Sequence, residues 1–304
     1  MRSRNERTKL FMDLTRVDPS KKLKLDSFDT GWAQNEEAKY LGKAEVRERA
    51  EKLLEENRME LEKAQELLYA NHTYAVLIVL QGRDAAGKDG TIKHVMSGIN
   101  PQGCRVVSFK QPSATELDHD FLWRETAALP EKGMIGIFNR SHYEEVLVTM
   151  VHHELLDKQN LPCKKYDKDF WDDRYQDILN YEKHLVRNGT VTLKFFLHLS
   201  KGEQKKRFLE RLENKNKYWK FSDADLKERD YWDQYTKAYE DMLNNTTSKF
   251  APWYVIPADY KWFARALVAD IITTSILSLG IKYPVVDDEK LQKIEEAKRK
   301  LEAE

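Results

Sequence analysis

One stretch, residues 76–95 with the sequence VLIVLQGRDAAGKDGTIKHV, constrains the fold of this chain more than any other. An apolar run is followed by a loop with the spacing G-x-x-x-x-G-K, from Gly82 to Lys88, and then by residues at helical spacing. Strand, glycine loop and helix in this order are typical of a P-loop, whose backbone N–H groups and helix N-terminus hold a phosphate. The stretch therefore predicts a phosphate site at the carboxyl end of a buried strand.

Two acidic residues lie in and beside this loop, although bare carboxylates repel phosphate. Asp84 is inside the loop, and Asp89 occupies the position where the pattern has Ser or Thr. A bound Mg²⁺ reverses the repulsion, because it accepts oxygen ligands and bridges to phosphate oxygens. We therefore expect Asp84 and Asp89 to hold Mg²⁺, or one of them to orient the attacking oxygen. Two structural alternatives stay open: Asp89 favours the positive end of the helix, and Asp84 bonds to its own turn.

Lys88 completes the glycine pattern and is long enough to reach the distal oxygens of a bound phosphate chain. Its ammonium group can neutralise charge on the phosphoryl group that is transferred, so we predict that it is catalytic. The other loop residues are predicted to surround the phosphates and the nucleotide: Gly82, Arg83, Ala85, Ala86, Gly87 and Gly90.

Further apolar runs along the chain predict the rest of a parallel sheet. Continuous apolar runs are typical of strands that are covered on both faces. Helical patterns separate the runs, and this alternation favours a three-layer α/β/α fold with a five-stranded parallel sheet. The predicted strands cover residues 73–80, 104–109, 134–138, 190–199 and 253–258. The predicted helices cover residues 42–70, 90–98, 115–128, 142–156, 169–187, 203–213, 223–244 and 263–281, followed by a charged helix at the C-terminus.

The length of 304 residues favours one large α/β domain over two equal ones. Within this single domain, 1–304, we expect an N-terminal arm and helix over residues 1–70 and the P-loop core over residues 71–200. A basic lid is expected over residues 201–235, and a C-terminal strand with helices over residues 236–304.

The third predicted strand ends in the sequence FNRSHYEEVL, which differs from the usual P-loop pattern. Asn139 stands where such strands usually end in Asp, so a metal would depend more on the acids of the loop. Arg140 follows directly and is expected to clamp a phosphate, because the carboxyl ends of parallel strands border the ligand crevice. Glu144 has two interpretations: it either completes a capping box with Ser141 or contacts substrate or metal in the crevice.

Arg124 lies on the helical segment that follows the second predicted strand. A second substrate usually docks at this place in kinases of this kind, so we expect Arg124 to bind the nucleotide. The alternative is a surface arginine that pairs with Asp120 or Glu125.

Residues 201–220, KGEQKKRFLERLENKNKYWK, carry eight Lys and Arg against three Glu. Arg207 and Arg211 are four residues apart on one helical face, where like charges repel unless an anion lies near them. A basic helical segment that closes over phosphates would exclude water from the reaction. The alternative is a solvated helix in which Glu203 pairs with Arg207.

Composition excludes other classes of protein. Basic and acidic residues are equal, 51 of each, which argues against a general nucleic-acid binder. The apolar segment 263–281 contains Arg265 and Asp270, so we expect a packed helix and no membrane span. The N-terminal sequence MRSRNERTKLF lacks the apolar run of a signal peptide. Cys104 and Cys163 have no metal-like spacing, and free thiols indicate a cytoplasmic protein.

Several segments together resemble the type 2 polyphosphate kinase family. They are GRDAAGKDGTIKHVMSGINPQGCRVVSFKQPSATELDHDFLWR, FNRSHYEEVLV, KKRFLERL, YWKFSDADLKERDYW and APWYVIPADYKWFARAL, and the resemblance covers about residues 40–285. It implies a fold like that of thymidylate kinase. It also implies that the chain moves a terminal phosphoryl group between inorganic polyphosphate and a nucleotide, with Mg²⁺.

The resemblance also implies roles for single residues. Asp84, Lys88 and Asp89 would act with the phosphates and the metal, and Arg140 would hold the phosphoryl region. Many members have Asp-Arg-Ser where this chain has Asn-Arg-Ser, and the difference resembles the class that phosphorylates both AMP and ADP, with Glu144 near the acceptor. The basic residues expected along the polyphosphate path or in the lid are Lys93, Arg207, Arg211 and Lys220.

The expected function is therefore a reversible, polyphosphate-dependent phosphorylation of AMP and ADP, giving ADP and ATP. The alternatives are an ATP-dependent nucleoside monophosphate kinase and a polyphosphate-binding protein without activity. The expected partners are polyphosphate and adenine nucleotides, with guanine nucleotides as a second option, and neither nucleic acid nor membrane. The family suggests a homo-oligomer, a dimer or a tetramer.

Overall fold

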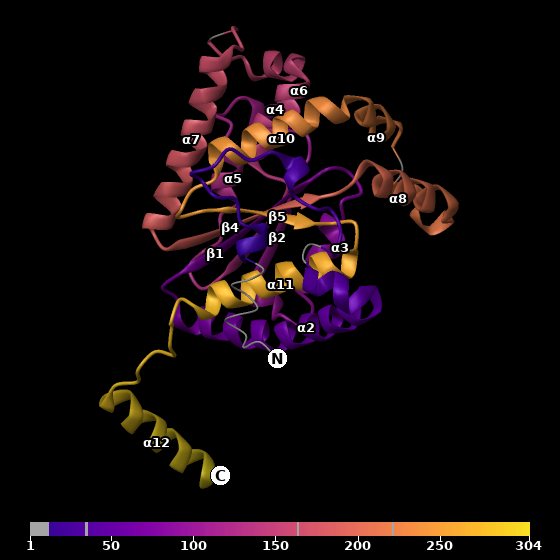
Figure 1. The fold of residues 1–304 in the computed structure, drawn as a ribbon. Coiled ribbons are helices and arrows are strands. Elements are labelled where there is room, and N and C mark those ends of the chain that lie inside the picture. The colour runs from indigo at the N-terminus through magenta and orange to yellow at the C-terminus, as the bar shows by residue number, and fades with distance from the viewer. Residues whose placement is uncertain (1–11, 34–35, 163, 221) are drawn as a thin grey trace.

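A computed structural model describes residues 12–33, 36–162, 164–220 and 222–304 (Figure 1). Cys163, one of the two expected free thiols, lies outside these residues, whereas Cys104 is a free, half-buried cysteine. No helix within the described ranges is both long enough and apolar enough to cross a membrane.

A five-stranded parallel sheet forms the centre of the structure, which confirms the predicted α/β class. The strand order is β2-β3-β1-β4-β5, so the P-loop strand β1 lies between two neighbours. Every residue of β1 is buried, as its unbroken apolar run predicts. The strands are β1 Ala75–Gly82, β2 Cys104–Ser108, β3 Ile135–Asn139, β4 Thr190–His198 and β5 Trp253–Pro257.

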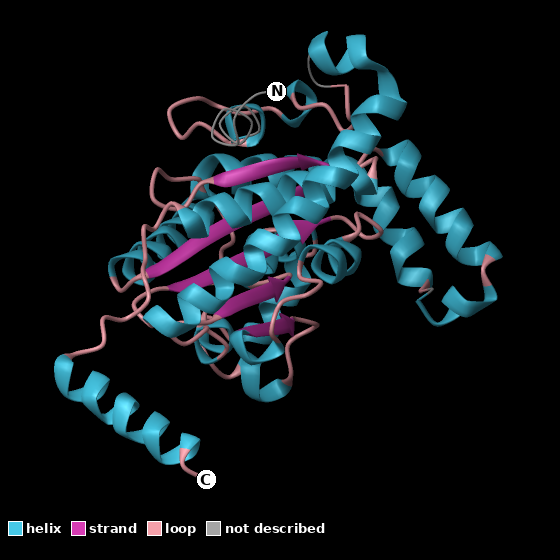
Figure 2. Ribbon diagram, turned by 90° about the horizontal axis from the view of Figure 1, so that it is seen from below, coloured by secondary structure: helices cyan, strands magenta, loops and turns pink. Residues whose placement is uncertain are grey.

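Helices cover both faces of this sheet and complete the three layers (Figures 1 and 2). On one face, α2 (Glu36–Asn71), α3 (Lys88–Val95) and α11 (Lys261–Leu277) pack on the side chains of β1 that point that way, Val76, Ile78 and Leu80. On the other face, α7 (Lys168–Arg187) and α10 (Trp232–Thr246) pack on Leu77 and Val79. The alternation of β1 side chains between the two faces thus divides the core into two halves.

Two predicted helices are interrupted in the structure. The segment expected over 115–128 forms the short helices α4 (Ala114–Leu117) and α5 (Trp123–Ala127), because Asp120 makes a turn between them by accepting a hydrogen bond from the N–H of Leu122. The segment expected over 142–156 consists of three short pieces, separated where Leu147 and His152 have non-helical backbone angles. These pieces are η3 (His142–Val146), α6 (Val148–Val151) and η4 (His153–Gln159).

The predicted lid is a helical extension at one edge of the fold. It comprises α8 (Lys201–Glu213), η5 (Lys215–Lys220), α9 (Asp223–Glu228) and η6 (Arg229–Tyr231), and it leads into α10. Figure 1 shows α8 and α9 projecting from the body beyond the carboxyl ends of the strands. The charged tail forms α12 (Asp288–Glu302), which projects from the opposite side.

A buried ion pair connects β4 to α7. Lys194 Nζ lies 2.6 Å from Glu182 Oε2 and 3.0 Å from the hydroxyl of Tyr143, and it donates to the carbonyl of Thr246 at 2.7 Å. Burial lowers the pKa of Lys194 and raises the pKa of Glu182, while their mutual attraction opposes both shifts. The pair thus fixes four elements around one buried charge, with no part in the pocket described below.

Lys194→Met is expected to reduce the free energy of unfolding by about 3–5 kcal/mol, because Glu182 is then left buried without its counter-charge. Chemical denaturation of the wild type and the variant measures the loss. Lys183→Met, on the exposed side of α7, is the matched control and should change the stability by less than about 0.5 kcal/mol. Equal stabilities of the two variants would contradict the assignment.

Candidate active site

A pocket of about 980 Å³ lies at the carboxyl ends of β1, β2 and β3, where parallel α/β sheets bind their ligands. The residues after β1, the residues after β2, the end of β3 and the inner side of α8 line it. The register of the sheet places Leu80 of β1 beside Asn139 of β3, so the P-loop and the end of β3 emerge side by side. One pocket therefore brings together the two sequence motifs predicted to carry the chemistry.

Backbone conformation gives the P-loop its shape. Gly87, the N-cap residue of α3, has φ of 105°, and Ala85 has φ of 63°, a left-handed conformation that is unusual for a residue with a side chain. A Cβ atom at Gly82 would lie 3.0 Å from the carbonyl oxygen of Leu197, so glycine permits the close approach of the loop to β4. The loop residues from Asp84 to Gly90 line the pocket.

Lys88 is the buried cation of this loop. Its Nζ donates to the carbonyl of Gly82 at 2.5 Å and lies 3.4 Å from the carbonyl of Arg83. Burial, with a smaller effect of the Arg140 charge, lowers the pKa of Lys88 to about 8, against the opposing effect of three nearby carboxylates. An anion in the pocket would restore the charged form, so Lys88 is suited to bind a phosphate.

Arg140 lies between two carboxylates at the end of β3. Its guanidinium is 2.7 Å from Asp84 Oδ1 and 3.2 Å from Glu144 Oε2, and these two charges raise its pKa against the effect of burial. Its φ of 65° places it in the left-handed region, where strain is common at functional sites. The ion pair of Arg140 and Asp84 is therefore a direct contact between the two motifs.

The predicted capping box of Ser141 and Glu144 is wrong. Ser141 Oγ accepts a hydrogen bond from the N–H of Tyr143 instead, and the carboxylate of Glu144 turns back to Arg140. The reason is the short 3₁₀ geometry of η3, which brings Glu144 to the same side as Arg140, four residues earlier. Glu144 lines the pocket, in accordance with the other interpretation.

Asp89 and Asn139 form the second contact between the motifs. Asn139 Nδ2 donates to Asp89 Oδ1 at 2.8 Å, while the buried Oδ1 of Asn139 has no hydrogen-bond partner among the described residues. A carboxylate beside an unsatisfied amide oxygen is a set of hard oxygen ligands, which Mg²⁺ prefers. The described residues contain no group of three or more His, Cys, Asp or Glu side chains that could hold a metal by themselves. Asp89 and Asn139 therefore fit a Mg²⁺ that takes its other ligands from phosphates and water.

Two predicted basic residues, Arg83 and Lys93, lie outside the lining of the pocket, whereas Arg207 lines it while its guanidinium bonds to the backbone of the P-loop. Arg83 turns away from the pocket, stacks on the ring of Trp232 at 3.8 Å and donates to the hydroxyl of Thr236 at 2.5 Å. Arg207 is buried and donates to the carbonyl of Ala85 and to others around it, so it braces the back of the loop. Lys93 is exposed on α3, outside the lining of the pocket.

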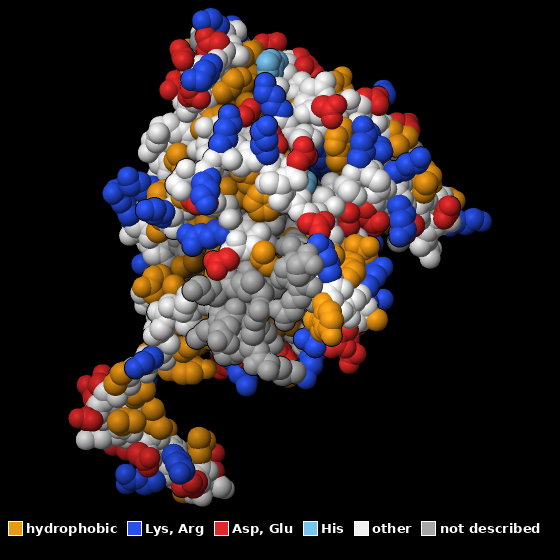
Figure 3. Space-filling model, in the orientation of Figure 1, with side chains coloured by type: hydrophobic (Ala, Val, Ile, Leu, Met, Phe, Trp, Pro, Cys, Tyr) orange, Lys and Arg blue, Asp and Glu red, His pale blue; other side chains and the backbone are white. Residues whose placement is uncertain are grey.

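Two other predicted cations do line the pocket. Arg124 donates to the carbonyl of Lys110 at 2.8 Å, and Arg211 lies 3.1 Å from Asp225 across the lid. Lys220 ends η5, and its side chain lies outside the described part of the chain. Figure 3 shows basic and acidic side chains intermixed over this face of the molecule, including the projecting lid.

Sequence reasoning missed the residues that follow β2. Ser108, the last residue of β2, and Lys110 and Gln111, which follow it, line the pocket, and Phe109 adds an apolar side chain to the lining. Their place directly after the second apolar run was a usable signal, because every strand end of a parallel sheet points to the same edge.

Glu125 is a buried carboxyl group beside Arg124. Its Oε1 lies 3.2 Å from Arg124 Nε, but neither carboxyl oxygen has a well-directed hydrogen bond among the described residues. Burial is the main cause that raises the pKa of Glu125 to about 7, and the charge of Arg124 only partly opposes it. The pairing of Arg124 with Glu125 thus coexists with the position of Arg124 in the pocket.

Because the pKa of Glu125 is higher in the folded than in the unfolded chain, the folded state holds the proton more strongly between about pH 4.5 and pH 7. Stability from this group is present below that window and lost as the pH rises through it, by about 1–3 kcal/mol. Glu125→Gln should not show this loss of stability with rising pH, because the amide side chain does not ionise. Denaturation of both proteins at pH 5 and pH 8 should show a smaller difference for the variant, and identical differences would contradict the assignment.

A parallel sheet of this order, with a P-loop between β1 and α3 and a pocket lined by buried cations and carboxylates, defines a P-loop phosphotransferase of the kinase type. The model of one family, described as polyphosphate kinase 2, matches residues 44–282. The chain belongs to the polyphosphate kinase 2 family.

Similar proteins agree with this assignment. An ADP-polyphosphate phosphotransferase of Rhodopseudomonas palustris is 54% identical over 241 residues, which cover 79% of this chain and 83% of the relative. An AMP/ADP-polyphosphate phosphotransferase of Meiothermus ruber is 48% identical over 224 residues, covering 74% and 80%. The crystal structure of polyphosphate kinase 2 from Arthrobacter aurescens TC1 is similar with a TM-score of 0.82 at 33% identity, and covers 94% of this chain and 96% of its own.

Proposed function

We propose that this chain transfers the terminal phosphoryl group of polyphosphate to ADP and to AMP, giving ATP and ADP, in a reversible reaction. The observation that carries the proposal is the contact of the P-loop with the end of β3, where Lys88, Arg140, Asp84 and Glu144 share one pocket. Membership of the family and the names of the two relatives, one of which includes AMP, support the choice of donor and acceptors.

The charges in the pocket suit phosphoryl transfer, which needs positioning and neutralisation more than covalent chemistry. Lys88 and Arg140 would oppose the negative charge of the transferred group. Asp84, which bonds to Arg140, would orient the attacking oxygen, and Arg124, which also lines the pocket, would bind the acceptor nucleotide. The pocket volume of about 980 Å³ is at the upper end for small-molecule sites, in keeping with two phosphorylated ligands at once.

Mg²⁺ is the proposed cofactor, and Asp89 with the free oxygen of Asn139 would hold it. When bound, the ion neutralises phosphate charge and orients the phosphate oxygens. This arrangement divides the two acids of the loop, because Asp84 is engaged by Arg140 and Asp89 faces Asn139.

An assay with two donors and two acceptors tests the proposal. The purified full chain is mixed with Mg²⁺, AMP or ADP, and either long-chain polyphosphate or ATP, and products are separated by anion-exchange chromatography. We expect polyphosphate to support formation of ADP from AMP and of ATP from ADP. If ATP supports phosphorylation of AMP and polyphosphate does not, the protein is a nucleoside monophosphate kinase. Binding of polyphosphate without any turnover would identify a binding protein.

A further inference from the structure

Side chains of the lid hold the P-loop by its backbone. Gln204 of α8, which is 4% exposed, donates from Nε2 to the carbonyl oxygen of Asp84 at 2.9 Å. One helical turn later, Arg207 donates to the carbonyls of Ala85 and Ala86 at 2.9 and 3.0 Å. Three consecutive carbonyls of the loop are therefore bound by one helix, so the position of α8 and the shape of the loop depend on each other.

A residue from the far end of the lid holds Gln204 in turn. Arg229 of η6 donates from Nη1 to Gln204 Oε1 at 2.6 Å. Both ends of the buried amide are thus engaged, one by Asp84 and one by Arg229. An amide that donates at one end and accepts at the other has a single orientation, since reversing it would place like groups together. Arg229 therefore determines which way Gln204 faces.

Besides its backbone carbonyl, the carboxylate of Asp84 is also bound, and its partner is Arg140 at the end of β3. Asp84 Oδ1 accepts from Arg140 Nη2 at 2.7 Å, and Arg140 lies 3.2 Å from Glu144. Hydrogen bonds and ion pairs consequently run without a gap from the lid to the wall of the pocket. The members, in order, are Arg229, Gln204, Asp84, Arg140 and Glu144.

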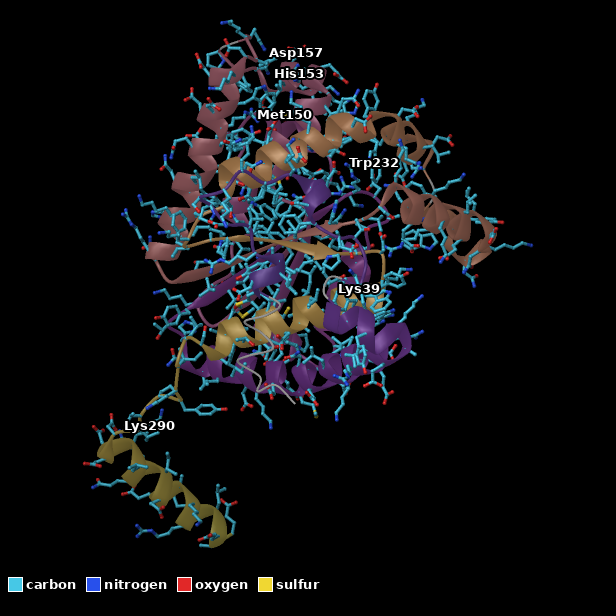
Figure 4. The ribbon with its side chains drawn as sticks, in the orientation of Figure 1. Lys39, Met150, His153, Asp157, Trp232 and Lys290 are labelled. Atoms are coloured by element: carbon cyan, nitrogen blue, oxygen red, sulfur yellow. The ribbon has the colours of Figure 1, made fainter. Side chains whose placement is uncertain are left out.

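A stacking contact beside this series of hydrogen bonds and ion pairs also connects the P-loop to the helix that follows the lid. Arg83, the residue before Asp84, lies 3.8 Å from the centre of the Trp232 ring. Trp232 is the first residue of α10, directly after η6, and Figure 4 shows it where the lid meets the body. Arg83 thus contacts the start of the helix that follows η6, while Asp84 is connected to Arg229 of η6 through Gln204.

We propose that Gln204 and Arg229 are positioning residues for the reaction. Gln204 fixes the backbone of Asp84, so that its carboxylate meets Arg140, and Arg229 acts through Gln204 by fixing the amide. The inference rests on the proposed function, because it assigns Asp84 and Arg140 to the transfer step. A misplacement of about 1 Å in such a group can cost a factor of about 10² in rate. Substrate affinity depends on other contacts and should change little.

Gln204→Met tests the proposal, because it keeps the length and helix preference of the side chain but removes both hydrogen bonds. With polyphosphate and ADP we expect kcat to fall by about 10–100-fold. KM for either substrate should stay within about threefold of the wild type, as expected when an interaction specific to the transition state is lost. The matched control is Gln176→Met, an exposed position on α7, which should leave both constants unchanged.

Arg229→Met provides an independent variant at a half-buried position, so it tests the proposal even where Gln204→Met folds poorly. We expect a smaller fall in kcat and an unchanged thermal midpoint. Arg229 also donates to the carbonyl of Lys201 in α8 at 3.3 Å, but its connection to the P-loop runs through Gln204, so the double variant should be no slower than Gln204→Met. Three results would overturn the proposal. They are a fall in kcat in the double variant equal to the product of the two single falls, a rise in KM with no change in kcat, and an unchanged kcat in either single variant.

The same experiment separates this inference from the proposed function. A wild-type protein that used only ATP as the donor would refute the dependence on polyphosphate. The variants, assayed with ATP, would still show whether kcat depends on Gln204 and Arg229.

Discussion

Lys88→Met is expected to lower kcat with polyphosphate and ADP by about 10³-fold or more, because the buried ammonium is the P-loop charge that opposes the transferred group. Methionine has nearly the same length and no charge, and removing an ammonium whose pKa burial has lowered relieves a desolvation cost. The variant also loses the hydrogen bond of Nζ to the carbonyl of Gly82, which opposes this gain, so its melting temperature should stay close to that of the wild type. Steady-state kinetics with a thermal melt measures both effects.

Lys63→Met is the matched control, since Lys63 is exposed on α2 and far from the pocket lining. It makes the same chemical change and should leave kcat within about twofold of the wild type. If Lys88→Met kept a tenth or more of the activity, Lys88 would not be the main charge in the loop.

Asp89→Ala is expected to reduce turnover by about 10²–10³-fold at millimolar Mg²⁺, a loss of the size seen when one group that stabilises transition-state charge is removed. Its carboxylate is the ligand that we assign to Mg²⁺, and Asn139 alone offers only a neutral amide oxygen. Higher Mg²⁺ should restore part of the activity, because weaker binding is overcome by concentration. Turnover measured across a Mg²⁺ series, together with a melt of each protein, shows this.

An exposed acid serves as the control for this change. Asp118→Ala, at the end of α4 and outside the pocket, should retain wild-type turnover and the wild-type dependence on Mg²⁺. A fully active Asp89→Ala protein would remove Asp89 from the metal site and leave it the structural role of an acid at a helix N-terminus.

Strand positions were predictable because the apolar runs are continuous and short. Each of the five expected strands lies within about two residues of the observed one, and β1 is buried throughout, as a central parallel strand should be. Helix 115–128 was predicted as one piece and is two, since the turn at Asp120 depends on a side-chain contact that periodicity does not report. The local sequence therefore predicted the strands of the sheet more accurately than the short helices beside the pocket.

Some of the residues that line the pocket were also predictable from local sequence. The P-loop and the end of β3 are recognisable from local sequence, and both line the pocket. The direction of a long side chain is not local. Arg207 bonds to loop residues more than 120 positions earlier, and Arg83 stacks on Trp232, which lies 149 positions later in the sequence. Arg83 was predicted to surround the phosphates, and Arg207 was predicted to lie along the polyphosphate path or to pair with Glu203, which it does at 2.9 Å. Charge alone does not show which neighbour a folded chain supplies.

The P-loop follows β1 in the sequence and contacts α8 of the lid, and this position has a consequence for hydrogen exchange. β1 is bonded to a neighbour on each side and is fully buried, so its amides should exchange only when the whole sheet opens. α8 and α9 project from the body, and their exposed backbone should exchange through small local openings. The loop thus joins the most protected and one of the least protected parts of the chain. A ligand that contacts both should slow exchange in the lid far more than in the sheet.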